Sequence, residues 1–216
     1  MKTTTTAGDK GAATLRVWDP MIRIFHWSLV VAFAVAYLTA EELDTVHEVA
    51  GYVVAGLVAF RLVWGLVGGK YARFRQFLTG PSKALAYVSD MVRGTERRYL
   101  GHNPAGAAMI VALLLALSGT AFTGWLLEDT SRVAMLPQMP QIVSPAFADE
   151  DGVAETLREG DGGAIKDVHE VLANLMLFLI AVHVGGVILA SVRHHENLAR
   201  AMVTGDKRAA GPDDVV

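Results

Sequence analysis

The sequence predicts an all-α integral membrane protein, a four-transmembrane-helix bundle with both termini cytoplasmic. Three observations lead to this fold class. The chain of 216 residues is 52% hydrophobic and only 19% charged, its apolar residues form long blocks, and its basic residues gather at one end of those blocks. Long apolar blocks without an amphipathic rhythm are typical of membrane spans.

Helices are expected over residues 22–40, 47–67, 104–127 and 168–192. The last two contain apolar runs of 23 and 22 residues, in which only His183 is titratable. The first two are less pure, because Arg23 comes just before the apolar block at 25–40 and Arg61 lies within the block at 49–67. The first block is interpreted as a span rather than a cleaved signal peptide, since it is longer than a signal core and follows a polar tail.

Basic residues set the expected orientation. Fifteen of the 19 Lys and Arg precede the first apolar block at 25–40, lie between residues 70 and 98, or follow the fourth helix. The turn at 41–48 has none, and the segment at 128–168 has three beside nine acidic residues. By the positive-inside rule both termini are cytoplasmic. The expected domains are an N-terminal tail at 1–20, a membrane domain at 21–205 with a periplasmic loop at 128–167, and a C-terminal tail at 206–216.

Two of the connecting segments have features of their own. The segment PSKALAYVSDMVRG at 81–94 has an apolar helical face between basic residues, which predicts a helix on the membrane surface. A plain solvated loop helix is the alternative. The acidic loop, which includes Asp149, Glu150 and Asp151, predicts either a solvated covering or a docking surface for a basic periplasmic partner.

Histidines mark the expected functional site. His169 and His183 are fourteen residues apart, so on one helix they lie about 40° apart around the axis and roughly 21 Å apart along it. With alternating helix directions, His47 falls at the level of His169, toward the periplasm, and His26 falls near the level of His183, toward the cytoplasm. A b-type haem held between helices needs one imidazole on each side of its ring, so the four residues supply two such sites.

Other interpretations of these residues stay open. A single His at a membrane interface is usually just a polar residue, and an interhelical hydrogen bond would also satisfy His183. Gly51 and Gly186, each about one turn after a histidine, would let a flat macrocycle approach the backbone or would let helices pack closely. The absence of cysteine excludes disulfides, iron–sulfur clusters, zinc thiolate sites and covalently attached c-type haem.

Several motifs together resemble the bacterial cytochrome b561 family, which includes the cytochrome b subunits of nickel–iron hydrogenases. These motifs are RVWDPMIRIFHW at 16–27, HEVAGY at 47–52, FRLVWGLVGGKYARF at 60–74, LGHNPAGA at 100–107, and the doublet of His169 and His183. The resemblance implies a four-helix protein of the bacterial inner membrane with two b-type haems. It places the axial ligands at His26, His47, His169 and His183.

The resemblance also implies partners. Family members pass electrons between quinone or quinol and a redox protein, such as a c-type cytochrome or a hydrogenase, or in some cases oxidise superoxide. We therefore expect a multi-pass membrane cytochrome of the respiratory chain with no role in nucleic-acid binding. The alternatives are a stand-alone superoxide:quinone oxidoreductase and a haem-free transporter that uses its histidines for a proton or a metal ion.

Two further residues are candidate contacts. Arg61 lies fourteen residues after His47, and a buried Arg needs an anion, for which a haem propionate or a lipid headgroup would serve. His102 comes before Asn103, expected to cap the third helix, and Pro104, expected in its first turn. It is either a structural interface residue or a contact for quinone or a proton. His194 and His195 are expected to be solvated.

Overall fold

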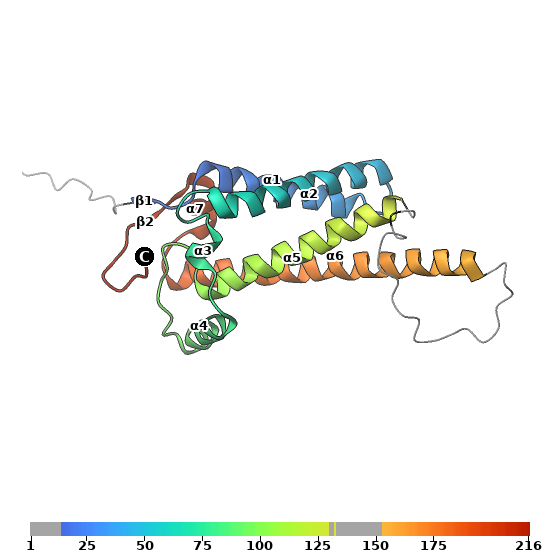
Figure 1. The fold of residues 1–216 in the computed structure, drawn as a ribbon. Helices are drawn as coiled ribbons and strands as arrows, with labels where there is room; N and C mark the ends of the chain where they lie inside the picture. Colours follow the sequence, from blue (N-terminus) through green and yellow to red (C-terminus); the bar gives the residue numbers. More distant parts are fainter. Residues whose placement is uncertain (1–13, 130–131, 133–152) are drawn as a thin grey trace, which may run out of the picture. The chain divides into compact units, whose positions relative to one another are not determined.

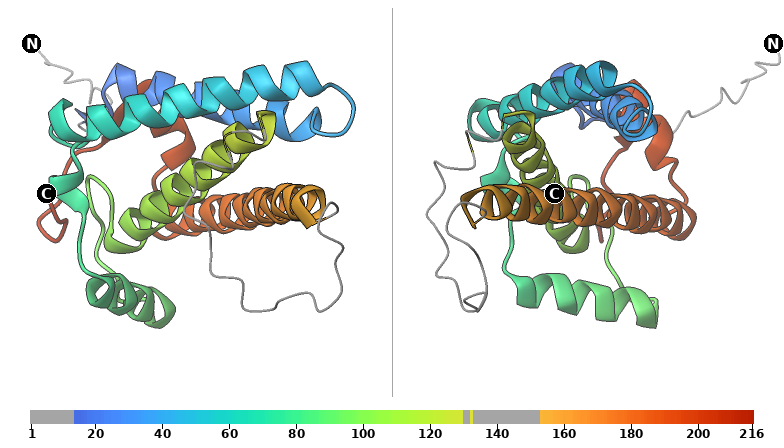
Figure 2. Two further views of the ribbon diagram at one scale, coloured as in Figure 1. Left: turned by 45° about the vertical axis from the view of Figure 1, so that its right-hand side comes forward. Right: turned by 90° about the vertical axis from the view of Figure 1, so that its right-hand side faces the viewer.

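The computed structural model of the chain describes residues 14–129, 132 and 153–216. Its secondary structure is mostly helical (Figures 1 and 2). The elements are β1 (Thr14–Arg16), α1 (Pro20–Leu38), α2 (Asp44–Val67), α3 (Phe74–Phe77), α4 (Pro81–Arg93), α5 (Pro104–Glu128), α6 (Val153–Arg193), α7 (Leu198–Thr204) and β2 (Asp206–Arg208).

Four of the described helices are long and apolar enough to cross a membrane. They are α1, α2, α5 and the part of α6 from Gly163 to Arg193. Many of their large apolar side chains are exposed, including Leu38, Leu66 and Phe178. Water would penalise so much exposed apolar surface, whereas lipid tails solvate it. The chain is therefore a multi-pass membrane protein.

The chain divides into two compact units, which we describe separately. The core unit contains Phe25–Leu62 and Met109–Val182, and the tail unit contains Met1–Ile24, Val63–Ala108 and His183–Val216. Each long helix contributes residues to both units.

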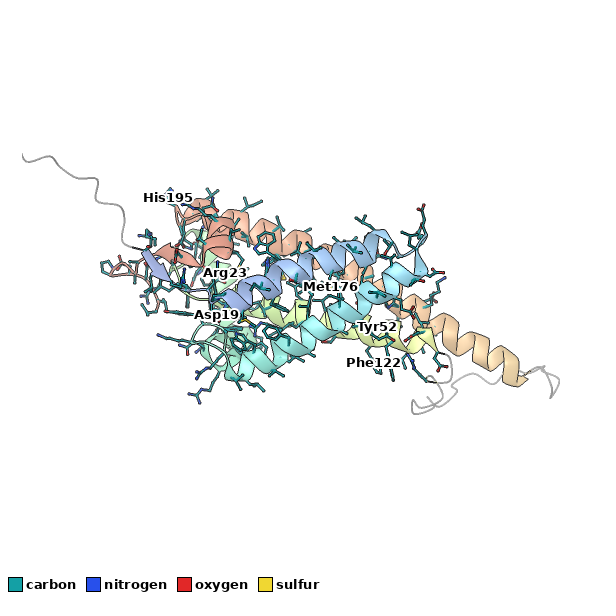
Figure 3. All side chains as sticks on the ribbon, turned by 90° about the horizontal axis from the view of Figure 1, so that it is seen from above. Asp19, Arg23, Tyr52, Phe122, Met176 and His195 are labelled. Carbon is teal, nitrogen blue, oxygen red and sulfur yellow. The ribbon has the colours of Figure 1, made fainter. Side chains whose placement is uncertain are left out.

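Side chains from four helices pack together in the core unit. Its buried cluster takes Ala32 from α1, Val54 and Val58 from α2, Ala116 and Leu117 from α5, and Met176 from α6 (Met176 is labelled in Figure 3). A Cβ atom on Gly119 would lie 3.0 Å from Leu172 Cδ1, so this glycine lets α5 approach α6 closely. Small residues at helix contacts are typical of membrane bundles.

Short local signals set the helix ends. Asp19 accepts a hydrogen bond from the backbone N–H of Ile22 at 2.9 Å and caps α1, where Pro20 opens the helix (Asp19 is labelled in Figure 3). Asn103 accepts from the backbone N–H of Gly106 at 2.7 Å and caps α5, with Pro104 as the first helical residue. The capping roles predicted for Asn103 and Pro104 are therefore confirmed.

The tail unit holds a small sheet that the all-α prediction missed. Strands β1 and β2 pair antiparallel, with Leu15 opposite Lys207, and lie side by side in Figure 1. The Gly205 carbonyl accepts from Val17 and Trp18, and the guanidinium of Arg23 donates to the Val203 carbonyl. Three-residue strands are too short to give a periodic signal, so the sequence alone did not reveal them.

A buried charge network, the Arg98 network, fastens the C-terminal segment within the tail unit. Arg98, whose side chain is 4% exposed, forms ion pairs with Glu196 at 2.7 Å and with Asp214. Lys207 lies 3.4 Å from Glu196 and donates to the carbonyls of Tyr99 and Leu100. The network joins the segment between α4 and α5 to residues that lie before, within and after β2 in the chain.

The fourth helix differs most from its prediction. Its start was expected near residue 168, but α6 begins at Val153. The glycines and acidic residues at 159–163 are typical of a loop. A helix nevertheless extends readily from a long stable span into the residues that precede the span in the chain. Residues 153–167 of the loop predicted at 128–167 are therefore helical, and its residues Asp149, Glu150 and Asp151 lie outside the described part of the chain.

Candidate functional site

Two of the predicted histidines meet in the core unit. His47 lies in the first turn of α2 and His169 lies on α6, and both side chains are half-buried. Their ring centroids are 6.1 Å apart, and the ring planes are inclined at 75°. The structure thus brings together the pair that helix direction predicted for one level.

The helix end beside His47 determines which of its ring nitrogens carries the proton. The last carbonyls of a helix lack partners within the helix, and Ala36 lies in the final turn of α1. The Ala36 carbonyl is 2.7 Å from His47 Nδ1. A carbonyl only accepts, so Nδ1 is the protonated donor and Nε2 carries the lone pair.

The hydroxyl of Thr123 determines which ring nitrogen of His169 carries the proton. The Thr123 hydroxyl lies 2.9 Å from the Gly119 carbonyl and 2.9 Å from His169 Nδ1. Since the hydroxyl has one proton and donates it to the carbonyl, it accepts from His169 Nδ1–H. His169 therefore also carries its lone pair on Nε2.

Both Nε2 atoms therefore carry a lone pair that can bind a metal ion. An imidazole–metal bond is about 2.0 Å long and a ring nitrogen lies about 1.1 Å from its centroid, so two rings on one metal ion have centroids about 6.2 Å apart. The observed 6.1 Å fits this arrangement. In the described part of the chain no three or more His, Cys, Asp or Glu are grouped to hold a metal ion. The pair therefore suits a metal whose other ligands come with a cofactor, as in haem.

Three glycines lie near histidines on the long helices, and they differ in what surrounds them. A Cβ on Gly124 would lie 3.1 Å from His169 Cε1, so the absence of a side chain there admits the ring. Nothing in the described structure lies within 4 Å of a Cβ built on Gly51 or on Gly186. Neither glycine therefore makes the close helix contact that was one of the two explanations for its presence.

The other predicted pair is divided between the units. His26 lies on α1 in the core unit, with its ring edge-on to Trp27 at 5.1 Å and its Nδ1 atom buried. His183 lies on α6 in the tail unit and is half-buried. The pairing of His26 with His183 stays a prediction.

Comparison with known proteins identifies the family. A sequence model described as prokaryotic cytochrome b561 matches residues 17–205, which is most of the chain. The chain belongs to the prokaryotic cytochrome b561 family. A probable Ni/Fe-hydrogenase B-type cytochrome subunit from Bradyrhizobium diazoefficiens is 27% identical over 54% of this chain, and the match spans 59% of that relative's length. No solved structure matches.

The family is described as a cytochrome b561, a class of membrane protein that holds b-type haem. Bound haem supplies reversible one-electron chemistry at its iron. The chain's part is to hold and orient that group: His47 and His169 are the residues that would hold it in the core unit, and the Ala36 carbonyl and Thr123 would orient the two rings.

The two candidate contacts have different surroundings in this cytochrome. Arg61 on α2 is 4% exposed in the core unit. The His102 ring packs between Trp18 and Phe77 in the tail unit, with centroids 4.7 and 4.4 Å away. His102 also lines a cavity of about 400 Å³ together with Tyr71 and Tyr99. This packing favours a structural role, while the cavity leaves the ring within reach of a ligand.

The expectation for the two histidines after α6 is only partly right. His195 is exposed and adopts a left-handed conformation with φ 49°, which ends α6. His194 is half-buried, and burial lowers the pKa of its imidazole. Neither lies in the core unit.

Sequence reasoning missed Thr123, Gly124 and the Ala36 carbonyl. A signal for the first two was present, because helix direction places Thr123 and Gly124 near the outer end of the third span, at the level of His47 and His169. No side-chain pattern marks a backbone carbonyl, so the third could not have been found in this way.

Proposed function

We propose that this chain is a di-haem b-type cytochrome of the bacterial inner membrane that transfers electrons between the quinone pool and a partner redox protein. The observation that carries the proposal is the His47–His169 pair, in which both Nδ1 atoms are occupied by hydrogen bonds at a ring separation of 6.1 Å. Two protein nitrogens on one iron leave no open coordination position, which suits electron relay rather than bond chemistry.

The second haem would lie between His26 and His183. Both are half-buried. They lie on α1 and α6, the two helices whose histidines are predicted to share the cytoplasmic level. A histidine in a membrane span needs a partner for its nitrogens. Arg61 would provide a counter-charge for a haem propionate, because its guanidinium is buried within a span.

The composition of the tail unit supports the proposed topology. It gathers the segment before α1, the connection from α2 to α5, and the segment after α6. The residues of the tail unit, which also include the ends of the long helices, carry fifteen of the 19 basic residues. Basic residues remain on the cytoplasmic side, so both termini would be cytoplasmic and the His47–His169 site would be periplasmic.

Quinone would react at the edge of a haem, because the irons have no free position. The cavity beside His102 is one place for a quinone ring, since Tyr71, Tyr99 and His102 line it together with Lys83 and Asp90. Aromatic walls with a few polar groups are typical of cofactor pockets.

The partner is proposed from the relative and from charge. The relative's name associates it with a Ni/Fe-hydrogenase, so a hydrogenase-like protein or a c-type cytochrome would exchange electrons at the periplasmic site. The acidic segment at 128–168 would favour encounter with a basic protein surface.

Haem content and single substitutions test the proposal. A pyridine haemochrome assay of the purified chain should give two b-type haems with low-spin spectra after reduction. His47→Ala and His169→Ala should remove or convert to high spin the same spectral component, and His26→Ala and His183→Ala should affect the other. His195→Ala serves as the control and should keep both.

Different outcomes would reject different parts of the proposal. One haem per chain would remove a pair, and no haem would reject the cytochrome function. Loss of the same component in His26→Ala and His169→Ala would reject the proposed topology. Turnover with superoxide by the purified chain, without a partner protein, would favour a superoxide:quinone oxidoreductase instead.

A further inference from the structure

The two rings of the core-unit pair differ in what accepts their Nδ1 protons. His47 donates to a backbone carbonyl, whose position is set by the end of α1. His169 Nδ1 lies 2.9 Å from a side chain, the hydroxyl of Thr123, which is 9% exposed, and the ring also forms a hydrogen bond with the Thr120 backbone carbonyl. Of these partners, only the Thr123 hydroxyl can be removed by a point substitution without altering the backbone.

The Thr123 hydroxyl is held in one position. It donates to the Gly119 carbonyl one turn earlier at 2.9 Å and lies 3.0 Å from the Thr120 carbonyl. A β-branched side chain has few rotamers in a helix, and this back-bond selects one of them. A hydroxyl that donates one hydrogen bond also becomes a better acceptor for another. Thr123 thus presents a fixed lone pair to His169.

Gly124 completes the arrangement beside Thr123. Its missing side chain lets the His169 ring approach α5, where a Cβ atom would lie 3.1 Å from Cε1. The ring is therefore confined on one side by the helix backbone and aligned by the hydroxyl. The 75° angle between the planes of His47 and His169 results from these contacts together with the Ala36 bond.

We infer that Thr123 is a positioning residue that sets the ring plane and the electron-donor strength of His169, and thereby the reduction potential of the haem held by His47 and His169. The inference rests on the proposed haem function. An imidazole that donates from Nδ1 is a stronger ligand to ferric iron, so its acceptor lowers the potential of the haem. Partners of this kind typically change metal affinity by about 10–100-fold.

The chain offers a matched control. Thr120 lies one turn before Thr123 on the same helix, and its hydroxyl makes the same kind of back-bond, to the Ala116 carbonyl at 2.9 Å. Replacing Thr120 by Val removes a hydroxyl of the same span without touching the Nδ1 atom of either histidine.

Redox titration of the purified chain with Thr123→Val, Thr123→Ala, Thr123→Ser and Thr120→Val tests the inference. Thr123→Val and Thr123→Ala should raise the midpoint potential of one haem by about 59 mV. For a one-electron couple this corresponds to about a tenfold change in the ferric-to-ferrous equilibrium constant. Thr123→Ser should return it toward the wild-type value, and Thr120→Val should leave it unchanged. Electron paramagnetic resonance of the ferric haem should show an altered low-spin anisotropy in Thr123→Val, because that signal depends on the angle between the axial rings.

The second haem reports whether the bundle of each variant is intact. Unchanged potential and unchanged anisotropy in Thr123→Val and Thr123→Ala, with both haems retained, would overturn the inference and leave the cytochrome function standing. Equal shifts in Thr120→Val and Thr123→Val would overturn it as well. A wild-type chain without haem would instead reject the proposed function itself.

Discussion

Gly124 contributes to the site because it lacks a Cβ atom. A Val side chain there would project its Cβ atom to within 3.1 Å of His169 Cε1, and overpacking of this kind costs about 1–3 kcal/mol. We expect Gly124→Val to weaken haem retention at the His47–His169 site by about 5–150-fold, measured as haem per chain after dilution with apomyoglobin as the acceptor.

Gly163→Val is the matched control for this prediction. Gly163 also lies in a helix, but nothing in the described structure comes within 4 Å of its Cβ position. Equal haem loss from the two variants would show that the space beside His169 is not what Gly124 provides.

Residue spacing and helix direction predicted that His47 and His169 share a level, because depth in a membrane follows from counting residues along a helix. The meeting of His47 and His169 is the visible result. The Thr123 and Ala36 contacts could not be predicted in the same way. They depend on the rotation of each helix about its axis, and apolar blocks without a clear moment leave that rotation undefined.

At the scale of elements, α4 has an apolar face that no described residue of the chain covers. Leu85 and Val92 are 71% and 79% exposed and lie on one side of the helix, while Tyr87 is buried on another side. Lys83 and Arg93 are basic residues of the same helix. The predicted helix at 81–94 is confirmed, and its exposed face favours the predicted location on the membrane surface.

Single cysteines can test the location of α4, because the chain has none of its own. A nitroxide on Leu85→Cys or Val92→Cys should be accessible to oxygen dissolved in lipid, and one on Ala86→Cys to a water-soluble nickel complex. The measurement is power saturation in nanodiscs that contain anionic lipid. Preferential access of the nickel complex to all three positions would instead make α4 a solvated loop helix.

Some helix boundaries could be predicted from the sequence and others could not. Caps and prolines gave the start of α5 at Pro104, since Asn103 and Pro104 are local signals that the backbone must obey. The start of α6 at Val153 was missed, because the polar sequence before a span resembles a loop even when the helix continues through it. Whether a helix continues depends on its stable neighbour rather than on the composition of the added residues.

Across the whole molecule, the Arg98 network joins segments that are far apart in the chain, and it has a predictable response to pH. Burial tends to raise the pKa of Glu196, but hydrogen bonds from Arg98 and the charge of Lys207 outweigh burial and hold that pKa below its ordinary value. A lowered carboxyl pKa stabilises the folded state above the ordinary value, and this stability is lost as the pH falls through the folded value.

We therefore expect thermal stability to decline below about pH 4.5, and Glu196→Gln to reduce that decline. At neutral pH this variant should lose about 3 kcal/mol, because Arg98 and Lys207 would remain buried with too little counter-charge. Circular dichroism in detergent at several pH values measures both effects. Arg16→Ala, which breaks an exposed pair with Asp206, should cost less than about 1 kcal/mol. A Glu196→Gln variant with wild-type stability at pH 7 would contradict the assigned role of the network.

The pairing of β1 with β2 has a consequence for biosynthesis. Thr14 is synthesised before the four candidate spans, whereas its partner Arg208 is synthesised after them. The membrane-insertion machinery must therefore release every span before this sheet can close, and the closing strands must be on the same side of the bilayer. An even number of crossings satisfies that condition. The sheet would thus act as a late check on insertion, because a chain that had left one span outside the bilayer would separate the two strands by a membrane.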